Sequence, residues 1–506
     1  MTNPLYDALF APHLGKQTPF IHVPDGQTLT HDAFLRMASK IAGALTEAGL
    51  VAGDRLALQV EKSPEALAVY AACVQKGIIF LPLNTAYTAV ELEYFIDNSG
   101  AKMVICDPSN ADSIAQITKR TGAALMTLVA SGAGSLMDAA SNQPETTETV
   151  ERSGDDLAAF LYTSGTTGRS KGAMLSQNNL LSNAEVLKDY WGFSKDDVLL
   201  HALPIFHTHG LFVASNIMLL SGGAMIFMRA FNPDTILTQM PNATSMMGVP
   251  TFYTRLLDHD GFSKESAAHM RLFISGSAPM LSETHEQFEA RTGQRILERY
   301  GMTETNMNTS NPYEGNRKAG TVGLPLPGVE VKVCDPESGA ELAQGEIGVL
   351  EVRGPNVFQG YWQMPEKTAE ELRKDGFFIT GDLGMIDDDG YVQIVGRGKD
   401  LIISGGYNIY PKEIELVIDD QPGVKESAVI GVPHPDFGES PVAVVVPEGD
   451  GPDIDQITEA CHAALARFKH PRKILICDAL PRNTMGKVQK NALRDEHSAL
   501  FANKES

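Results

Sequence analysis

The sequence has few cysteines, and they form none of the patterns typical of disulfide or zinc sites. Five cysteines lie far apart among 506 residues, and no two are separated by only two residues. This spacing excludes a disulfide framework and a thiolate zinc site, and it favours a reducing compartment. We therefore predict a cytoplasmic location.

Long apolar runs and positive charge are also scarce. No run approaches the ~18 apolar residues that a transmembrane helix needs. The first residues, MTNPLYDALFAPHLGK, lack the basic start and apolar core of a secretory signal. Lys and Arg number 41 against 63 Asp and Glu, a formal net charge of −22. A chain this acidic is a poor binder of nucleic acid or anionic membranes, so neither is an expected partner.

What the sequence does have is a regular alternation of short apolar runs and amphipathic stretches. Residues 55–60 (RLALQV) predict a buried strand, and Ser63 and Pro64 then begin a helix that ends near Gly77. A capping box at residues 88–91 (TAVE) opens a second helix. Strand–helix–strand repetition predicts an α/β fold in which helices cover parallel sheets.

The pattern changes at about residue 320. Short β-rich segments separated by turns continue to about residue 398, and a small α/β pattern of strands and helices follows. We therefore expect a large N-terminal domain, residues 1–398, which includes a β-rich subdomain at about 320–398. Residues 399–506 are expected to form a small, mobile C-terminal α/β domain.

A loop rich in glycine and hydroxyl groups follows the apolar run at residues 157–162. Its sequence, residues 163–172, is TSGTTGRSKG. Glycines let backbone N–H groups converge on an anion, hydroxyls add donors and Lys171 adds positive charge. The loop is not a Walker A motif, because Ser170 stands where that motif needs glycine before its lysine. It predicts a phosphate-binding site of another kind.

This loop is similar to the phosphate-binding loop of the adenylate-forming superfamily, which comprises acyl-CoA synthetases, luciferases and the adenylation domains of peptide synthetases. Further segments match the superfamily's motifs in its order: GSAP at 276–279, YGMTE at 300–304, TGD at 380–382, GRGKD at 396–400, GGYNIYPKE at 405–413 and PRNTMGK at 481–487. The resemblance spans residues of about 160 to 490. It implies an acid–thiol ligase that uses ATP and CoA as substrates and Mg²⁺ as cofactor.

The resemblance also implies a nucleotide site. The ring of Tyr300 would lie against adenine, Thr303 would reach a phosphate, and Glu304 would serve as a hard oxygen ligand for Mg²⁺. Asp382 would accept the ribose hydroxyls, and Arg397 would make a second ribose or phosphate contact. The other ATP-binding positions are Thr163, Ser164, Gly165, Thr166, Thr167, Gly168, Lys171 and Ser277.

The C-terminal motifs imply a domain rotation between two half-reactions. Lys487 resembles the superfamily's adenylation lysine, whose charge would stabilise the negative charge that develops on the α-phosphate. Lys399 resembles the hinge, and the loop Gly405–Gly406–Tyr407 would serve the thiolation step with CoA. In related synthetases the lysine that Lys487 resembles can be acylated, which removes its charge. A lysine acyltransferase and a deacylase acting on Lys487 are therefore expected partners.

Arg299 bears on which acid is activated. A buried guanidinium without a partner is costly in a pocket for fatty or aromatic acids, whereas a dicarboxylate supplies a bidentate partner. His207 adds a second donor, Thr208 and Met307 limit the pocket, and Arg169 is a further cation. This set resembles the acid pocket of malonyl-CoA synthetases. The expected product from malonate, and from methylmalonate as a second acid, is the CoA thioester, with release of AMP and pyrophosphate.

Several alternatives stay open at this point. Arg299 can instead turn outward and pair with Glu298 or another surface acid. The enzyme can be a ligase for another short or aromatic carboxylic acid, or a free-standing adenylation enzyme that loads a carrier protein. No carrier domain fits after residue 490, which favours CoA as the thiol. A basic stretch at 469–473 is expected to meet the 3′-phosphate of CoA or to form a solvated turn.

Overall fold

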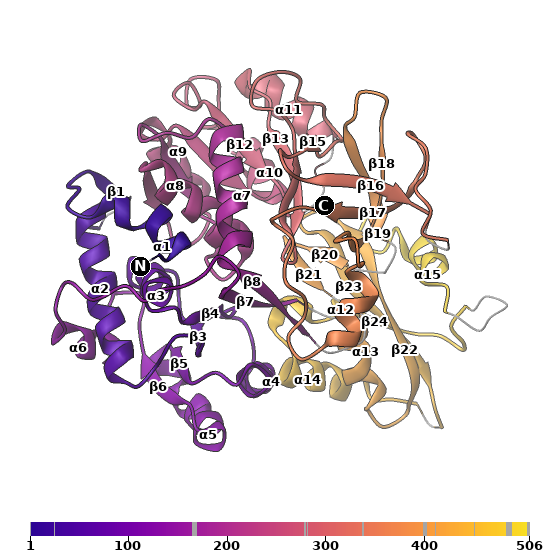
Figure 1. Ribbon diagram of the computed structural model, residues 1–506. Coiled ribbons are helices and arrows are strands. Elements are labelled where there is room, and N and C mark those ends of the chain that lie inside the picture. The colour runs from indigo at the N-terminus through magenta and orange to yellow at the C-terminus, as the bar shows by residue number, and fades with distance from the viewer. Residues whose placement is uncertain are drawn as a thin grey trace. The chain divides into compact units, whose positions relative to one another are not determined.

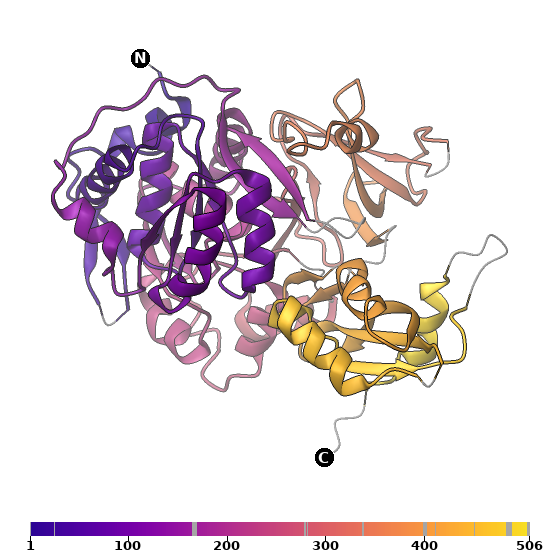
Figure 2. The same ribbon diagram turned by 90° about the horizontal axis from the view of Figure 1, so that it is seen from below.

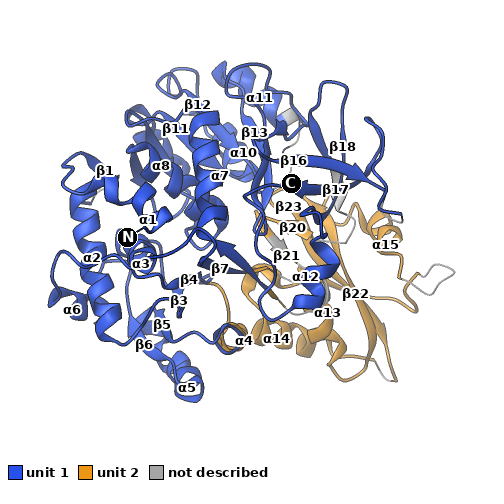
Figure 3. Cartoon of the chain, viewed as in Figure 1, with its two compact units in different colours: residues 1–85, 96–161, 172–396 blue, residues 86–95, 162–171, 397–506 orange. Residues whose placement is uncertain are grey.

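The computed structural model describes residues 2–24, 26–163, 170–277, 280, 282–335, 338–397, 402–409, 411–449, 451–481 and 488–502. The chain divides into two compact units (Figure 3). Unit 1 contains residues 1–85, 96–161 and 172–396, and unit 2 contains residues 86–95, 162–171 and 397–506. Unit 2 is therefore discontinuous in sequence. The predicted domain boundary at Lys399 lies outside the described residues.

Unit 1 contains two large sheets rich in parallel pairs (Figure 1). The six-stranded sheet has the order β6 (Ala124–Thr127), β5 (Met103–Cys106), β3 (Arg55–Gln59), β4 (Ile79–Pro82), β7 (Leu157–Thr163) and β8 (Lys171–Ser176). Its pairs β3–β4, β3–β5, β4–β7 and β5–β6 are parallel. Strands of this kind are covered on both faces, which explains why β4 and β5 are apolar and buried throughout.

The nine-stranded sheet carries two of the predicted acid-site residues, Arg299 and Met307. Its order is β15 (Leu324–Pro325), β14 (Asn306–Ser310), β13 (Leu297–Met302), β12 (Leu272–Ser275), β11 (Ser245–Gly248), β9 (Val198–His201), β10 (Ala224–Phe227), β1 (Pro19–His22) and β2 (Thr28–Thr30). The central pairs from β1 to β13 are parallel, and β13–β14 is antiparallel. The YGMTE motif thus begins on β13, at the change from parallel to antiparallel pairing.

The following helices precede the C-terminal part of the chain (Figures 1 and 2). They are α1 (Pro4–Leu9), α2 (His31–Glu47), α3 (Pro64–Lys76), α4 (Ala89–Ser99), α5 (Ala111–Thr121), α6 (Ser135–Ser141), α7 (Gln177–Tyr190), α8 (Asn216–Ser221), α9 (Pro233–Gln239), α10 (Pro250–Leu257), α11 (Ser282–Thr292) and α12 (Pro365–Glu371). Helix α4 begins in unit 2 and continues into unit 1. The helices and strands together confirm the predicted α/β fold class.

The predicted β-rich region is a four-stranded sheet in unit 1. Its order is β16 (Glu330–Cys334), β17 (Gly348–Arg353), β18 (Phe378–Ile386) and β19 (Val392–Arg397). Pairs β16–β17 and β17–β18 are antiparallel, and α12 lies in the connection between β17 and β18. Asp382 of the TGD motif lies within β18.

The C-terminal part of unit 2 is a five-stranded sheet with helices. The strands are β21 (Tyr407–Ile409), β20 (Ile402–Ser404), β23 (Gly438–Pro447), β22 (Val424–His434) and β24 (Lys473–Ile476). The helices are α13 (Pro411–Asp419), α14 (Ile454–Ala464) and α15 (Lys490–His497). Buried isoleucine, valine and alanine side chains from α13, α14, β20, β22 and β23 form a core of their own.

Local signals in the sequence set two helix starts as expected. The Ser63 hydroxyl accepts from the N–H of Ala66 at 3.1 Å, and Gly77 ends the same helix in the left-handed region with φ 66°. At α4 the Thr88 N–H and hydroxyl both donate to the Glu91 carboxylate, at 3.0 and 3.1 Å. Both predictions are confirmed because caps depend on residues three or four positions apart.

Candidate active site

Two of the predicted nucleotide residues lie together in unit 1. Tyr300 is on β13 and Asp382 is on β18, and the Tyr300 hydroxyl donates to the Asp382 carboxylate at 2.5 Å. Both side chains are buried. The contact fixes a carboxylate beside an aromatic ring, which is the pair of groups expected to meet a ribose and an adenine.

Glu304 lies just beyond β13 and is held by a residue that the sequence did not single out. The Tyr361 hydroxyl lies 3.0 Å from a Glu304 carboxylate oxygen and 2.7 Å from a Glu371 carboxylate oxygen. Lys367 also contacts Glu371, at 3.0 Å. Thr303 precedes Glu304 in the same turn and is half-buried.

The donor set around Glu304 suits a nucleotide-bound magnesium ion rather than a closed metal site. In the described part of the chain, no three His, Cys, Asp or Glu side chains gather closely enough to hold a metal. Glu304 is 5% exposed and offers a carboxylate. Magnesium is usually bound by one or two carboxylates together with substrate phosphates, so a single glutamate fits MgATP.

Arg299 is a buried cation of unit 1. It lies on β13 and is 3% exposed. Among the described residues, neither its Nε nor its Nη2 has a hydrogen-bond partner. Burial lowers the pKa of the guanidinium to about 9. An unsatisfied buried cation costs folding free energy, so this position is built to receive an anion.

Glu298, the neighbour on β13, does not serve as the partner of Arg299. Successive side chains on a strand point to opposite faces. The Glu298 carboxylate contacts His285 Nδ1 at 3.2 Å, and both residues are buried. The alternative in which Arg299 turns outward to pair with Glu298 is therefore wrong.

Two histidines of the segment 204–210 (PIFHTHG) lie close enough to Arg299 to feel its charge. Burial and Arg299 lower the pKa of His207, and the same causes lower the pKa of His209 well below its ordinary value. Both imidazoles are therefore neutral near pH 7, and the guanidinium alone supplies charge. The sequence reasoning selected His207 but missed His209, although two histidines flanking one threonine were visible.

His209 is fixed from one side by Ser277. Its Nδ1 lies 3.2 Å from the Ser277 hydroxyl, and its Nε2 has no hydrogen-bond partner among the residues that the structure describes. Ser277 has φ 70°, a left-handed conformation that is uncommon for a residue with a side chain. Such strained positions cluster at functional sites. Ser277, predicted to bind ATP, is thus placed beside a histidine of the acid segment.

Thr208 and Met307 are both buried in unit 1. Thr208 is 4% exposed, and its hydroxyl has no partner within the described ranges. Met307 is 2% exposed on β14, and its backbone is bonded to the amide of Asn183. Their predicted role in limiting an acid pocket stays a prediction.

A second buried basic side chain, Lys62, contacts the chain just before this segment. Lys62 donates to His201 Nδ1 at 2.8 Å and to the carbonyls of His201 and Leu203 at 2.7 and 2.8 Å. His201 Nε2 in turn lies 2.8 Å from the Gly210 carbonyl, within the π-helix His209–Ser215. Burial lowers the pKa of Lys62 well below its ordinary value. π-Helical turns are frequent at functional sites, which agrees with the place of His209.

The described ends of the phosphate loop lie in unit 2. Thr163 ends β7 and is half-buried, and Lys171 begins β8 and is 5% exposed. Between them, Ser170 donates from its hydroxyl to a Glu413 oxygen at 3.1 Å, and its carbonyl accepts from Tyr94 at 2.8 Å. The loop therefore ends in contact with the first turn of α13.

The basic stretch at 469–473 differs from the expectation. Lys469 is 3% exposed, and its ammonium contacts Glu91 at 2.7 Å and Glu413 at 3.0 Å. Burial lowers the pKa of Lys469, but Glu413, Tyr87 and Glu91 raise it more, so the net pKa is raised. Lys469 is therefore not available to a CoA phosphate, and that prediction is wrong for this residue. We call Lys469, Glu91 and Glu413 the lysine cluster.

The predicted CoA loop lies between β20 and β21. Gly405 and Gly406 adopt φ 56° and 82°, which only glycine does without strain. The ring of Tyr407 stacks on Phe468, with ring centroids 4.5 Å apart. These glycines make a tight turn, and the Gly405 N–H donates to the Phe437 carbonyl at 2.9 Å.

Several predicted residues lie outside the described part of the chain. They are Ser164, Gly165, Thr166, Thr167, Gly168, Arg169, Lys399 and Lys487. Arg397 ends β19, but its side chain is likewise outside the described part. Their roles stay predictions.

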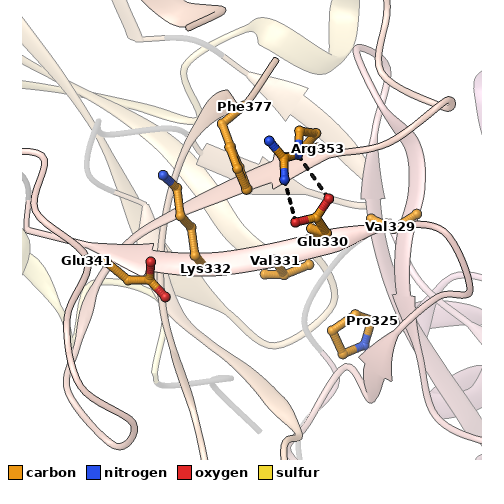
Figure 4. A pocket seen from close by; sticks show the side chains of 8 residues that line it. All are labelled: Pro325, Val329, Glu330, Val331, Lys332, Glu341, Arg353 and Phe377. Atoms are coloured by element: carbon orange, nitrogen blue, oxygen red, sulfur yellow. Dashed lines mark hydrogen bonds and ion pairs between the residues drawn. The ribbon is translucent and has the colours of Figure 1, made fainter. Parts of the chain in front are cut away.

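A cavity of about 500 Å³ lies on the four-stranded sheet, and its lining contains none of the predicted site residues that the structure describes (Figure 4). Its lining is Pro325, Val329, Glu330, Val331, Lys332, Glu341, Arg353 and Phe377. Arg353 pairs with Glu330 at 2.6 Å, and the cations of Lys332 and Arg353 lie 4.1 and 4.4 Å from the Phe377 ring centroid. These charged groups already have partners.

Comparison with known families decides the class. Residues 12–362 match the model of the AMP-binding enzyme family, and residues 413–487 match the AMP-binding enzyme C-terminal domain. This chain belongs to the AMP-binding enzyme family. It is an ATP-dependent, AMP-forming acyl-CoA synthetase, as the motifs implied. In the described part of this AMP-binding enzyme, we find no helix with the length and apolar character to span a membrane.

Two curated relatives differ in the acid they are named for. The feruloyl-CoA synthase of Amycolatopsis sp is 36% identical over 474 residues, which cover 93% of this AMP-binding enzyme and 94% of the relative. The malonate–CoA ligase of Arabidopsis thaliana is 34% identical over 480 residues, covering 88% and 78%. Overall similarity therefore leaves the acid open.

Solved structures of similar proteins agree with the fold. ATP-bound MatB from Rhodopseudomonas palustris is 57% identical, with a TM-score of 0.79 over 99% of this AMP-binding enzyme and 100% of that chain. A malonyl-CoA ligase in a ternary product complex with methylmalonyl-CoA and AMP is 34% identical, with a TM-score of 0.80 over 95% and 100%.

Proposed function

We propose that this synthetase joins malonate to CoA, with methylmalonate as a second acid, through an acyl-adenylate. The observation that carries the proposal is Arg299. Its guanidinium is buried, charged below pH about 9, and has unused donors among the described residues. A carboxylate is the group that such a planar fork binds best, and only a dicarboxylic acid has a second one to offer. The similarity to malonate and malonyl-CoA ligases supports this choice.

In the proposed complex, Arg299 holds the distal carboxylate and leaves the other carboxylate free to react. Neutral His207 and His209 offer uncharged donors beside it, so the pocket balances one negative charge with one positive charge. Thr208 and Met307 limit the length and width of the acid. Arg169 is a proposed further cation of this site. A monocarboxylic acid would leave the buried guanidinium unpaired, which disfavours it.

The first half-reaction forms the mixed anhydride. A carboxylate oxygen attacks the α-phosphorus of ATP, and pyrophosphate leaves. We assign Tyr300 and Asp382 to the adenosine of ATP. Thr303 would contact a phosphate, and Ser277 would bind ATP. Glu304 would hold a magnesium ion that neutralises phosphate charge. The phosphate loop would hold the departing phosphates with Thr163, its glycines and Lys171, and Lys487 would stabilise charge at the α-phosphate.

In the second half-reaction the CoA thiol attacks the acyl carbonyl, and AMP leaves. We assign the loop Gly405–Gly406–Tyr407 to the thiol approach, because its glycine backbone admits a close ligand. Lys399 remains the proposed hinge between the half-reactions, and residues 1–398 and 399–506 the proposed domains. Acylation of Lys487 by a lysine acyltransferase would abolish the first half-reaction only.

The experiment is a substrate panel. Pyrophosphate release is measured with MgATP and malonate, methylmalonate, oxalate, acetate, octanoate, coumarate or ferulate, each with and without CoA. We expect strong, CoA-dependent turnover with malonate and weaker turnover with methylmalonate. Turnover on ferulate or octanoate without turnover on malonate would keep the ligase and overturn the dicarboxylate pocket.

A further inference from the structure

Gly276 lies against the guanidinium of Arg299. It follows β12 directly, and a Cβ added there would lie 2.4 Å from Arg299 Cζ, 2.5 Å from Nη1 and 2.7 Å from Nε. Real carbon atoms do not approach one another this closely without displacement. Three atoms of the Arg299 guanidinium therefore occupy the space that the side chain of any residue other than glycine would need at position 276.

The backbone at this corner is fixed on both sides. The Gly276 N–H donates to the Gly248 carbonyl at 3.3 Å, and Ser277 contacts His209 at 3.2 Å. The strand that carries Arg299 is paired with β12 through Ile274 and with β14 through Ser310. A new methyl group would therefore push the guanidinium, which is the far end of a flexible side chain, and not the backbone.

We propose that Gly276 is a specificity-determining position, because its missing side chain leaves the space in which Arg299 holds the distal carboxylate. This inference rests on the proposed function. Bidentate binding requires both nitrogens of the fork to face the carboxylate, so a shift of about 1 Å is enough to cost about 10²-fold. Gly276 acts through Arg299 and does not touch the reacting atoms.

The test is Gly276→Ala, measured as ATP–pyrophosphate exchange with malonate and with acetate. The φ of Gly276 lies outside the left-handed region, so alanine is compatible with the backbone. We expect the KM for malonate to rise at least tenfold, while the KM for ATP and the slow rate with acetate stay unchanged. Gly43→Ala is the matched control, since the three atoms nearest to its Cβ would all belong to the Gln143 side chain, the first of them Oε1 at 2.8 Å.

The double variant Gly276→Ala/Arg299→Leu separates the inference from the proposed function. If Gly276 acts through Arg299, the double variant matches Arg299→Leu alone. Additive losses, or a malonate KM unchanged by Gly276→Ala, would overturn the inference and leave the proposed function standing. If Arg299→Leu itself keeps full malonate activity, the proposed function fails first. Loss of ATP binding in Gly276→Ala would also overturn the inference, because the substitution would then act on the nucleotide site and not on the distal carboxylate.

Discussion

Arg299 in unit 1 and Lys469 in unit 2 are both 3% exposed, but their surroundings are opposite. Lys469 contacts two carboxylates and its pKa is raised, whereas Arg299 has two donor nitrogens without partners within the described residues and its pKa is lowered to about 9. A paired buried cation is part of the fold. An unpaired one costs stability that a bound anion can restore, which marks a ligand site.

The largest effect is expected at Lys469. Lys469→Met leaves Glu91 and Glu413 buried without their cation, which should lower the free energy of unfolding by about 3–5 kcal/mol. Urea unfolding followed by circular dichroism measures it. The control Lys469→Met/Glu413→Gln removes one of the stranded charges and should regain part of the loss. If Lys469→Met kept full stability, the lysine cluster would not be stabilising the fold.

Arg299→Leu should act on the reaction and not on the fold. Loss of a buried charge pair with substrate should lower kcat/KM for malonate by about 10²- to 10³-fold, with the KM for ATP unchanged. The free energy of unfolding should stay the same or rise, because the variant removes an unpaired charge. Arg299→Lys, which keeps the charge but loses the fork, should fall between the two. If Arg299→Leu lost as much stability as Lys469→Met, Arg299 would have a structural role like that of Lys469, and the proposed difference between the two cations would be wrong.

The pKa of Arg299 predicts that kcat/KM for malonate decreases at alkaline pH. Below pH about 9 the guanidinium is protonated, and above it the proton is lost, so kcat/KM for malonate should fall about tenfold per pH unit above 9. ATP–pyrophosphate exchange without CoA avoids titration of the thiol. Arg299→Leu should lack this decrease, and a decrease retained in that variant would assign it to another group.

The same pKa has an effect of known sign on stability. Burial holds the pKa of Arg299 at about 9 against an ordinary value of 12.5, so between these values the unfolded chain binds more protons. The free energy of unfolding contributed by this group therefore rises with pH over that interval. Arg299→Leu should remove this rise, which urea titrations at pH 8.5 and 10 would detect.

The smallest effect is expected at an exposed pair. Arg353 and Glu330 contact at 2.6 Å, but their side chains are 40% and 60% exposed. Arg353→Ala should change the free energy of unfolding very little, because water screens exposed ion pairs. The same urea assay checks this. A loss of unfolding free energy near that of Lys469→Met would mean that burial does not determine how much a paired cation contributes to stability.

Local features of the fold were predictable from the sequence, and distant pairings were not. The Ser63 cap and the Thr88–Glu91 capping box follow from residues three positions apart, and the apolar run at residues 157–162 lies on β7. Lys469 was assigned to CoA because its partner Glu91 lies 378 positions away, where no local pattern links them.

The candidate site shows the same limit. Strand alternation separates Glu298 from Arg299, but it does not say which of the two faces lacks an acceptor. Tyr361 contacts Glu304 from 57 positions away. Gly276 lies against the guanidinium of Arg299, and the GSAP motif alone does not indicate that contact. Such relations depend on tertiary packing, and the sequence carries no period or spacing that encodes them.

The lysine cluster has a consequence for exchanging parts between relatives. Glu91 comes from the first hundred residues, while Glu413 and Lys469 come from the last hundred. A recombination near residue 397 would transplant the lysine without one of its acids. Hybrids of two synthetases should therefore keep their stability only when residues 86–95 and the C-terminal segment are inherited from the same parent.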